Sequence, residues 1–380
     1  MAGAQKAGRQ RQLTDAERIA WLRLIRSANV GPGTFFRLLD RFGTAAKALD
    51  ALPHLARRGG RAGAIRIASN AEAERELTAA ERIGATAVAW CEPAYPPLLV
   101  HIHDPPPVIY ARGALDLLGK KTIGVVGARN ASANGRRFAK KLAADLGAGG
   151  LMVTSGLARG IDAAAHDGAL ETGTAAVLGG GVDIVYPTEN RPLYDRIAEA
   201  GVLLSEVAPG TQPQARHFPR RNRIISGMAR GVVVVEASPR SGSLITARLA
   251  LEQGREVFAV PGAAMDPRAR GTNDLIRQGA TLTESADDVF SVLNDSRPPA
   301  HPNIHIENQR VENEMSDADD VPSAREEIIR ALGPTPTTVD EVLRVCQFSL
   351  AVVSTVLLEL ELAGRLERHP GSKVSLLMDH

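Results

Sequence analysis

The sequence predicts an α/β fold built around a doubly wound, mostly parallel β-sheet. From residue 121 to about 293, short continuous apolar segments alternate with segments of helical length. Apolar segments without polar alternation indicate strands buried on both faces, and the intervening helices indicate crossovers between parallel strands. The chain has 380 residues, more than one hydrophobic core usually spans, so we expect further domains beside the sheet.

Five segments are expected along the chain. They are a disordered tail (1–12), an N-terminal helical domain (13–85), the sheet domain (86–295), an acidic, proline-containing linker (296–321) and a winged-helix domain (322–380). Charge is uneven: residues 1–66 carry 13 Lys and Arg against 4 Asp and Glu, whereas residues 307–327 carry 8 Asp and Glu against 2 Arg. Such asymmetry favours contact of the basic part with nucleic acid, although basic surfaces also occur without that partner.

The N-terminal domain begins with a capping box. Thr14 has the character of an N-cap and Glu17 follows three residues later, which predicts a helix start. The turn 30–34, with the sequence VGPGT, then precedes a second helix. Two helices joined in this way are typical of a helix-hairpin-helix, whose second helix can hold a phosphate at its N-terminus, or of a plain turn between packed helices. A further helix is expected over 71–83.

The sheet domain contains the following predicted elements. The strands are expected at 86–90, 108–111, 122–126, 151–154, 174–178, 202–205, 232–236, 257–260 and 281–282. The helices are expected at 133–146, 161–171, 192–200, 222–229, 242–253 and 272–278. Ligands of such sheets bind beyond the carboxyl ends of the strands, so these ends are where a site is expected.

Arginines, small residues and a tyrosine gather at these strand ends. They are Arg129 after the first parallel strand, Ser155, Gly156 and Arg159 after the second, and Tyr186, Asn190 and Arg191 after the third. A dense cluster then follows the fourth strand, with Arg216, Arg220, Arg221, Asn222 and Arg223. Arginine forks suit phosphates and an aromatic face suits a base, so the edge is predicted to hold a polyanion. The alternative is that the clustered arginines pair with acidic side chains elsewhere in the fold.

Enzymatic machinery is less evident. The first parallel strand ends at 124–129 as GVVGAR rather than G-x-G-x-x-G, so no dinucleotide cofactor is expected. Ser155, Asp162 and His166 could be cast as a triad, but the G-x-S-x-G elbow is absent. An enzyme acting on nucleotide phosphates is the rival interpretation, and Asp183 and Glu236 are its only plausible acids or bases.

The C-terminal domain is predicted as three helices, 324–332, 339–344 and 350–363, followed by a hairpin over 366–376. In DNA readers of this kind the last helix enters the major groove. Here that helix carries Glu359 and Glu361 and no Lys or Arg. We therefore expect a protein contact or weak DNA binding rather than sequence-specific reading.

Other features bound the class of protein. Cys91 and Cys346 provide neither a disulfide framework nor the spacing of metal ligands, which fits a reducing cytoplasm. No apolar segment approaches the roughly 20 residues of a membrane helix, and the N-terminus lacks the apolar core of a secretory signal. A cytoplasmic protein without membrane contact, metal or cofactor is expected.

Several motifs together resemble the DprA/Smf DNA-processing family. They are 155–166 (SGLARGIDAAAH), 176–183 (AVLGGGVD), 186–190 (YPxxN), 218–227 (FPxRNRIISG) and 241–247 (SGSLITA), with 95–98 (YPPL) and 260–262 (VPG). The resemblance implies an extended Rossmann-like central domain, a helical N-terminal domain of the SAM or helix-hairpin-helix kind, and a C-terminal winged helix. It implies a non-enzymatic, sequence-independent binder of single-stranded DNA that protects incoming strands. Such a protein loads the RecA recombinase during natural transformation and tends to form a homodimer.

The resemblance also implies a DNA-binding pocket when its motifs are matched to this sequence. The matching residues are Arg129, Ser155, Gly156, Arg159, Tyr186, Asn190, Arg191, Arg221, Asn222 and Arg223. Ala128 stands where such family members have Ser or Thr, which removes one hydroxyl donor from the first strand end.

Overall fold

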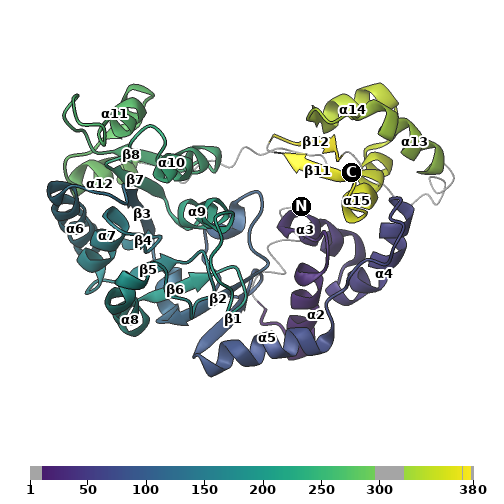
Figure 1. Cartoon of the computed structure of the whole chain (residues 1–380), viewed down its shortest axis with the longest axis horizontal. Helices are drawn as coiled ribbons and strands as arrows, with labels where there is room; N and C mark the ends of the chain where they lie inside the picture. The colour runs from purple at the N-terminus through teal and green to yellow at the C-terminus, as the bar shows by residue number, and fades with distance from the viewer. Residues whose placement is uncertain (1–10, 296–320, 370, 378–380) are drawn as a thin grey trace. The chain divides into compact units, whose positions relative to one another are not determined.

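The computed structural model describes residues 11–295, 321–369 and 371–377. Almost all of the predicted tail (1–12) and linker (296–321) therefore lies outside the described residues. The chain divides into two compact units (Figure 1), one formed by residues 14–73 with the described C-terminal residues and the other by residues 11–13 and 74–295. The N-terminal and C-terminal domains thus belong to one unit, which their separation in the sequence does not reveal.

The N-terminal part of the first unit is helical. Its helices are α2 (Asp15–Arg26), α3 (Pro32–Phe42), α4 (Ala45–Arg58) and α5 (Asn70–Arg82), the last of which continues into the second unit. The predicted capping box is confirmed, because Thr14 Oγ1 accepts a hydrogen bond from Glu17 N and Glu17 Oε2 accepts one from Thr14 N. Helix α3 begins in the glycine-proline turn, as predicted, with Gly31 as its N-cap.

The C-terminal part of the first unit is a winged helix, as predicted. Its elements are α13 (Val321–Ala331), β10 (Thr337–Thr338), α14 (Val339–Cys346), α15 (Leu350–Leu362), β11 (Leu366–His369) and β12 (Lys373–Leu376). The strands form an antiparallel sheet in the order β10-β12-β11, and the wing pairs Leu366 with Leu376. Apolar side chains of all three helices, among them Ile328, Val342 and Val356, form one buried core with the wing.

The second unit contains a nine-stranded sheet in the order β1-β2-β6-β5-β4-β3-β7-β8-β9. Its strands are β1 (Ala85–Ala89), β2 (Val108–Gly113), β3 (Thr122–Gly127), β4 (Met152–Ser155), β5 (Thr174–Val177), β6 (Val202–Ser205), β7 (Gly231–Val235), β8 (Glu256–Ala259) and β9 (Thr281–Leu282). All pairings from β6 to β9 are parallel, and β1 and β2 extend the sheet antiparallel beyond β6. The predicted doubly wound, mostly parallel sheet is confirmed.

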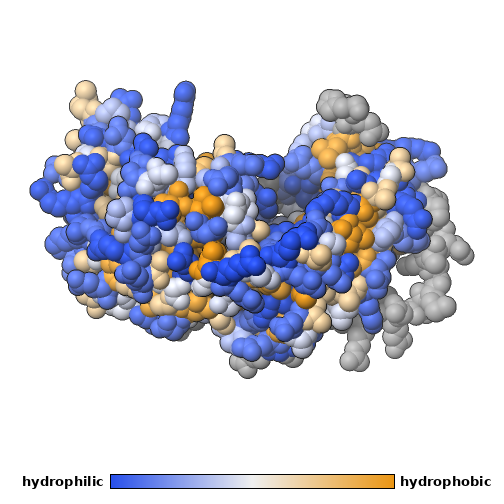
Figure 2. All heavy atoms as spheres, turned by 60° about the horizontal axis from the view of Figure 1, so that its bottom comes forward, coloured by the Kyte–Doolittle hydropathy of each residue, from blue (hydrophilic) through white to orange (hydrophobic). Residues whose placement is uncertain are grey.

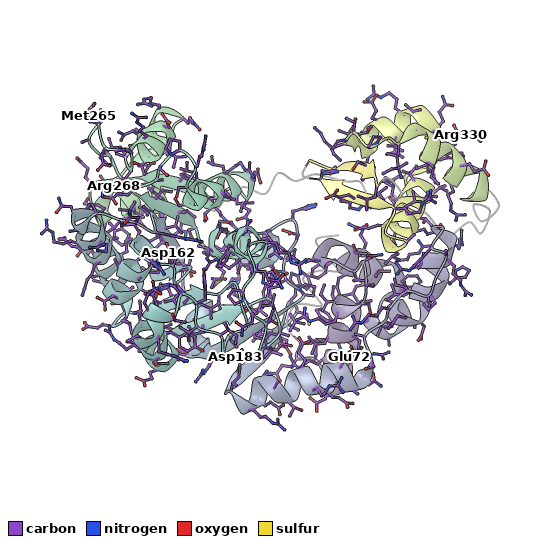
Figure 3. The ribbon with its side chains drawn as sticks, viewed as in Figure 1. Glu72, Asp162, Asp183, Met265, Arg268 and Arg330 are labelled. Carbon is purple, nitrogen blue, oxygen red and sulfur yellow. The ribbon has the colours of Figure 1, made fainter. Side chains whose placement is uncertain are left out.

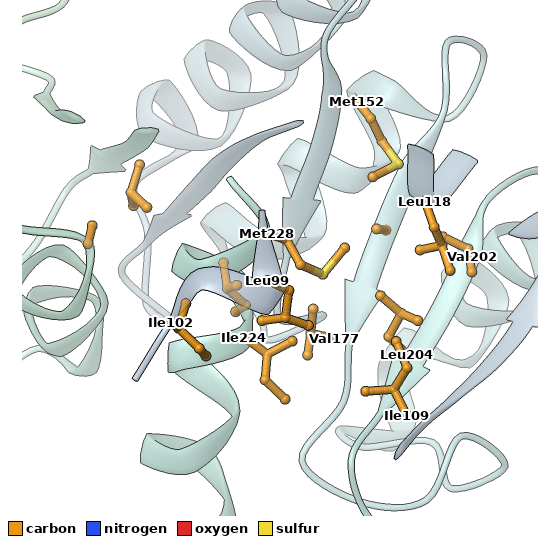
Figure 4. Packing of buried hydrophobic residues seen from close by; sticks show 14 of the residues in the cluster. Leu99, Ile102, Ile109, Leu118, Met152, Val177, Val202, Leu204, Ile224 and Met228 are labelled. Carbon is orange, nitrogen blue, oxygen red and sulfur yellow. The ribbon is translucent and has the colours of Figure 1, made fainter. Parts of the chain in front are cut away.

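Helices and short 3₁₀ turns cover both faces of this sheet. They are η1 (Leu99–His101), η2 (Leu115–Gly119), α6 (Ala133–Ala148), α7 (Ile161–Ala169), η3 (Thr188–Asn190), α8 (Arg191–Ala200), α9 (His217–Met228), α10 (Gly242–Glu252), α11 (Arg270–Arg277) and α12 (Ala286–Asp295). Helices α6, α7 and α12 pack on the face to which β3 contributes Ile123 and Val125, and α9 and α10 pack on the face to which it contributes Val126. On the latter face, Leu99 and Ile102 lie beside Ile224 (Figure 4).

Helix α9 departs from the prediction. It begins at His217 rather than at residue 222, with Arg216 as its N-cap. Arg220 and Arg221 therefore lie on the helix with Arg223 instead of in the loop before it. Pro219 is tolerated because it occupies the first turn, where a backbone N–H has no helical acceptor. The arginines of the cluster are therefore divided between the buried and the exposed side of α9.

Hydrophilic residues cover most of the face seen in Figure 2, with smaller hydrophobic patches between them. Within the described residues, no single helix is long and apolar enough to cross a membrane. Helices α14 and α15 meet that criterion only when taken together, and the chain bends by 119° between them.

Candidate nucleic-acid interface

Where the strand order reverses, between β3 and β7, a carboxylate of the protein itself binds the start of a helix. Glu236, directly after β7, accepts hydrogen bonds from Ser132 N at 2.8 Å and from Ser132 Oγ at 2.5 Å. Ser132 is the N-cap of α6, and its Oγ also accepts from Gly135 N at 2.9 Å. Sheets of this class bind ligand phosphates at such a helix N-terminus, and here Glu236 supplies the negative charge.

The loop after β4 is held by buried side chains. Asp162 on α7 (Figure 3) accepts from Gly156 N at 3.1 Å and from Ala158 N at 3.4 Å. Burial raises the pKa of this carboxyl, and the charge of Arg221 opposes the rise. Ser155 Oγ donates to Val125 O at 2.6 Å. These bonds fix the backbone between the strand and the helix.

His166 is part of the same support. Its Nε2 accepts from Leu157 N at 3.3 Å, and its Nδ1 lies 2.7 Å from Thr174 Oγ1. Because Thr174 Oγ1 donates to Val153 O, Nδ1 carries the proton. Burial, with a smaller effect from Arg221, lowers the pKa of His166 to about 3. Ser155 and His166 thus bond to different partners, and the arrangement is not a catalytic triad.

Arg221 is buried rather than presented to a ligand. Its side chain extends from α9 to the ends of β4 and β5, where Nη1 donates to Gly156 O at 2.6 Å and to Val177 O. The residue is 6% exposed, and burial lowers its pKa to about 10. Gly156 leaves room for the guanidinium, because a Cβ there would lie 2.3 Å from Nη1. Arg221 therefore stabilises the strand ends and cannot contact DNA in this arrangement.

Arg223 is also enclosed by the fold. Its Nη2 donates to Glu206 Oε1 at 2.6 Å, and its Nε lies 3.0 Å from Asp104 Oδ2. This pairing matches the alternative that clustered arginines neutralise acids of the protein. Asn222, between the two, donates from Nδ2 to Gly242 O at 3.4 Å and so contacts the start of α10.

The remaining predicted residues lie at the surface around an aromatic pair. Tyr186 is 49% exposed, and the centroid of its ring lies 5.6 Å from that of Phe218, with the planes tilted by 39°. The guanidinium carbon of Arg129 lies 5.4 Å from the Phe218 centroid. The end of β3, the loop after β5 and the start of α9 thus meet in one cationic and aromatic surface, which we call the stacking surface (Arg129, Tyr186, Phe218).

Further exposed cations belong to the neighbouring loops. Arg159 forms an exposed ion pair with Glu189, and Arg191 Nη1 lies 3.8 Å from Asp195 Oδ1. Asn190 donates from Nδ2 to Leu157 O at 2.9 Å, which joins the loop after β5 to the loop after β4. Exposed ion pairs of this kind contribute little stability, so both arginines can exchange their partners for an incoming anion.

The sequence interpretation did not select Phe218 as a site residue, and it placed Arg216 and Arg220 in the cationic cluster without including them among the residues matched to the DNA-binding pocket. Arg216 and Arg220 are exposed and, within the described part of the chain, have no acidic partner. Helical spacing does not separate them from Arg221, because Arg220 itself lies four positions before the buried residue Ile224. The exposure of Arg216 and Arg220 therefore has no signal in the spacing of apolar residues along α9.

The two carboxylates of the rival enzyme interpretation are not brought together. Asp183 follows β5 and Glu236 follows β7, with β4 and β3 between those strands, a separation of about 14 Å in the plane of the sheet. Asp183 (Figure 3) accepts twice from Gly210 N, at 2.8 and 3.0 Å. Both acids hold backbone or caps of the fold.

Comparison with known families covers all three parts of the chain. Residues 86–294 match the family model described as DNA recombination-mediator protein A. Residues 15–79 match the DprA-like N-terminal HHH domain, and residues 312–372 match the DprA winged helix domain.

Curated relatives and solved structures agree with these matches. DNA processing protein DprA of Bacillus subtilis (strain 168) is 46% identical over 222 residues, which are 58% of this chain and 75% of that protein. Protein Smf of Escherichia coli (strain K12) is 40% identical over 287 residues, 74% of this chain and 75% of that protein. The X-ray structure of DNA processing protein A from Streptococcus pneumoniae superposes with a TM-score of 0.61 at 34% identity, covering 74% of this chain and 98% of that chain.

A second structure concerns a nucleic-acid binding mode. It is of DNA processing protein A from Helicobacter pylori, described as showing a single-stranded DNA binding mode, with a TM-score of 0.52, 27% identity, and coverage of 56% of this chain and 97% of that chain. The family model of DNA recombination-mediator protein A covers the sheet domain of this chain, and Protein Smf of Escherichia coli is 40% identical over 74% of the chain. The chain therefore belongs to the DprA/Smf family of DNA-processing, recombination-mediator proteins.

Proposed function

We propose that this protein binds single-stranded DNA without reading its sequence, through the carboxyl edge of the parallel sheet. The observation that carries the proposal is the stacking surface, in which an exposed tyrosine lies beside Phe218 and the guanidinium of Arg129 lies over the same ring. Stacking on an aromatic ring tolerates any base, and it requires a base that is not already stacked in a duplex. The surface therefore favours single strands.

Phosphate contacts would come from the exposed cations around this surface. They are Arg129, Arg159, Arg191, Arg216 and Arg220. Arg221 and Arg223 have a supporting role in the proposal, since each already neutralises or caps groups of the protein. Ser155 and Gly156 likewise support the loop that carries Arg159, and Asn190 holds the loop that carries Tyr186.

We further propose a non-enzymatic role, with no nucleotide cofactor. The helix N-terminus that would receive a nucleotide phosphate is bound by Glu236, and the charge of this carboxylate would repel a second anion there. His166, whose pKa is lowered to about 3, has both ring nitrogens engaged by the fold. The two acids considered for the rival function, hydrolysis or transfer at a nucleotide phosphate, are both engaged by the fold: Glu236 accepts from Ser132 and Asp183 accepts from Gly210.

Membership of the family supports the remaining parts of the proposal. We infer that the protein protects incoming single strands in the cytoplasm, acts as a homodimer, and loads the RecA recombinase during transformation or recombination. Sedimentation of the full chain tests the dimer. RecA ATPase activity on single strands already coated by a single-strand-binding protein tests loading, which requires stimulation by this protein; an unchanged rate overturns that part.

Fluorescence anisotropy with labelled single-stranded and duplex DNA tests the binding function. We expect tight binding to the single strand and weaker binding to the duplex. The salt slope, which is the slope of the logarithm of the association constant against the logarithm of the salt concentration, should be about −0.7 for each phosphate contact. Equal affinity for several base compositions would support readout without sequence. Absence of binding to either form at low salt would overturn the proposal, and release of free base or phosphate from a nucleotide panel would favour the rival.

A further inference from the structure

Within the first unit, the last helix of the winged-helix domain packs against the N-terminal helices. Gly59, the C-cap of α4, approaches the backbone of α15 so closely that a Cβ there would lie 1.9 Å from Glu359 O. Asn29 Nδ2 donates to Leu362 O at 3.0 Å, and Arg365 Nη1 donates to Gly59 O at 3.4 Å. The helix that enters the major groove in DNA readers of this fold is here covered by protein.

Glu361 of α15 is bound by two residues of α3. Its Oε1 accepts from Thr34 Oγ1 at 2.6 Å, and its Oε2 accepts from Arg37 Nη2 at 2.6 Å. Arg368 of the wing donates from Nε to the same Oε2 at 2.9 Å. The carboxylate is 16% exposed. Thr34 lies in the first turn of α3, where the helix-hairpin-helix interpretation would put a phosphate.

Glu359 makes the second acidic contact. Its side chain is fully buried and accepts from Arg325 Nη2 at 2.6 Å, while Arg58 Nε of α4 lies 3.0 Å from the other carboxylate oxygen without the alignment of a hydrogen bond. Arg41 of α3 donates from Nη1 to Thr355 Oγ1 at 3.1 Å. Three arginines of the N-terminal helices, Arg37, Arg41 and Arg58, thus meet oxygen acceptors on α15.

We propose that this arginine face of α3 and α4 is a second binding site for the DNA sugar-phosphate backbone, and that α15 covers it with Glu359 and Glu361 in the place of phosphates. A guanidinium binds a carboxylate and a phosphate with the same fork of donors. The N-terminal helices bring Arg37, Arg41 and Arg58 to the contact, and α15 contributes acids and no Lys or Arg. DNA and α15 therefore compete for one face.

This site shares no residue with the sheet edge, so the two proposals can fail separately. The test uses the full chain with two opening variants. Glu361→Gln removes the negative charge of the carboxylate that binds Thr34 and Arg37, and it keeps the shape of the side chain. Gly59→Ala leaves every charge in place and pushes α15 away from α4, since the residue has an ordinary helical backbone (φ −70°) that alanine adopts without strain.

The readouts are anisotropy with a labelled single strand across a salt series and hydrogen exchange of α15. In both variants we expect α15 to exchange faster and affinity to rise about tenfold at low salt, with a salt slope steeper by about 2 because three arginines gain phosphates. Adding Arg37→Ala to either variant should cancel most of the gain.

Two results would overturn the proposal. The first is faster hydrogen exchange of α15 with unchanged affinity for DNA and an unchanged salt slope. That result would mean that the contact holds the two domains together without covering a DNA-binding site. The second is unchanged exchange in both variants, which would mean that these residues do not hold the cover. Repeating Glu361→Gln with Arg129→Ala separates the sites: a retained gain supports the second site, and loss of all binding assigns DNA to the sheet edge alone. Circular dichroism verifies that each variant is folded.

Discussion

Arg221 donates from Nη1 to the carbonyl oxygen of Gly156 across 2.6 Å, and joins α9 to the end of β4. The two residues are 65 positions apart in the chain. The guanidinium of Arg221 occupies the space that any side chain at position 156 would fill. In turn, Gly156 O is one of the two carbonyl oxygens that accept a hydrogen bond from Arg221 Nη1, and the other is Val177 O. The exposed cations of the site are thus arranged around a buried one.

Replacing Arg221 should therefore affect stability, and replacing its neighbour should affect binding. Arg221→Met removes a buried charge-assisted pair of hydrogen bonds and leaves Asp162 without its counter-charge, which costs about 3–5 kcal/mol in the free energy of unfolding. Arg220→Met, on the exposed side of the same helix, should change stability by less than about 0.5 kcal/mol and weaken DNA binding. Urea unfolding and anisotropy measure both. Equal stability of the two variants would contradict the division of α9 into two sides.

Arg129→Ala should weaken binding of single strands of every composition by a similar factor. The substitution removes a cation over Phe218 and one phosphate contact, so we expect about a 5- to 30-fold loss of affinity at moderate salt and a salt slope shallower by about 0.7. Lys121→Ala is the matched control, because Lys121 is exposed and precedes β3, at the opposite edge of the sheet. If the control loses as much affinity as Arg129→Ala, the contacts are not localised at the carboxyl edge.

Tyr186→Ala should reduce affinity by the free energy of one stacked base, about 1–3 kcal/mol, and Tyr186→Phe should retain most of it because the ring remains. Competition between single-stranded and duplex DNA provides the measurement, since loss of stacking lowers the preference for single strands as well as the affinity. An affinity in Tyr186→Phe as low as in Tyr186→Ala would assign the contribution to the hydroxyl instead.

The buried His166 should make stability fall as the pH falls. Its pKa is about 3 in the folded state and near 6.5 when unfolded, so the unfolded state binds the additional proton between these values. The contribution of His166 is intact above about pH 6.5 and decreases by up to about 1.4 kcal/mol per pH unit as the pH falls toward 3. At about pH 5 the loss is about 2 kcal/mol relative to neutral pH.

Urea unfolding of the wild type and of His166→Gln at neutral and mildly acidic pH measures this loss. The variant starts from a lower stability because its hydrogen bonds differ, but it should lose less stability between the two pH values. Parallel curves for the two proteins would show that another group governs the acid response.

Much of the fold follows from local patterns. Strand β6 spans 202–205 and β9 spans 281–282, as predicted, and the other parallel strands differ from prediction by one residue at one end or at both ends. This agreement reflects the apolar segments themselves: a strand buried on both faces has few polar residues, and the glycines and caps around it mark its ends. The capping residues Thr14, Ser132 and Ser349 begin helices for the same local reason.

Local sequence patterns predicted less of the site, because the role of each side chain depends on which side of its helix or strand faces the core. The helix was predicted to begin at residue 222, which left Arg221 in a loop, whereas α9 begins at His217 and buries both Arg221 and Arg223. Glu236 looked like a free acid because its partner, Ser132, lies 104 positions earlier. Pairing between distant segments has no signature in the spacing of either one.

The contact of Thr34 with Glu361 spans 327 positions of the chain, and this has a consequence during synthesis. Translation at about 5–20 residues per second separates the appearance of α3 from that of α15 by roughly 15–65 s. During that interval the N-terminal helices have left the ribosome with their arginines uncovered, in surroundings rich in RNA. We therefore expect the nascent chain to associate with polyanions more strongly than the finished protein, until its last helix arrives.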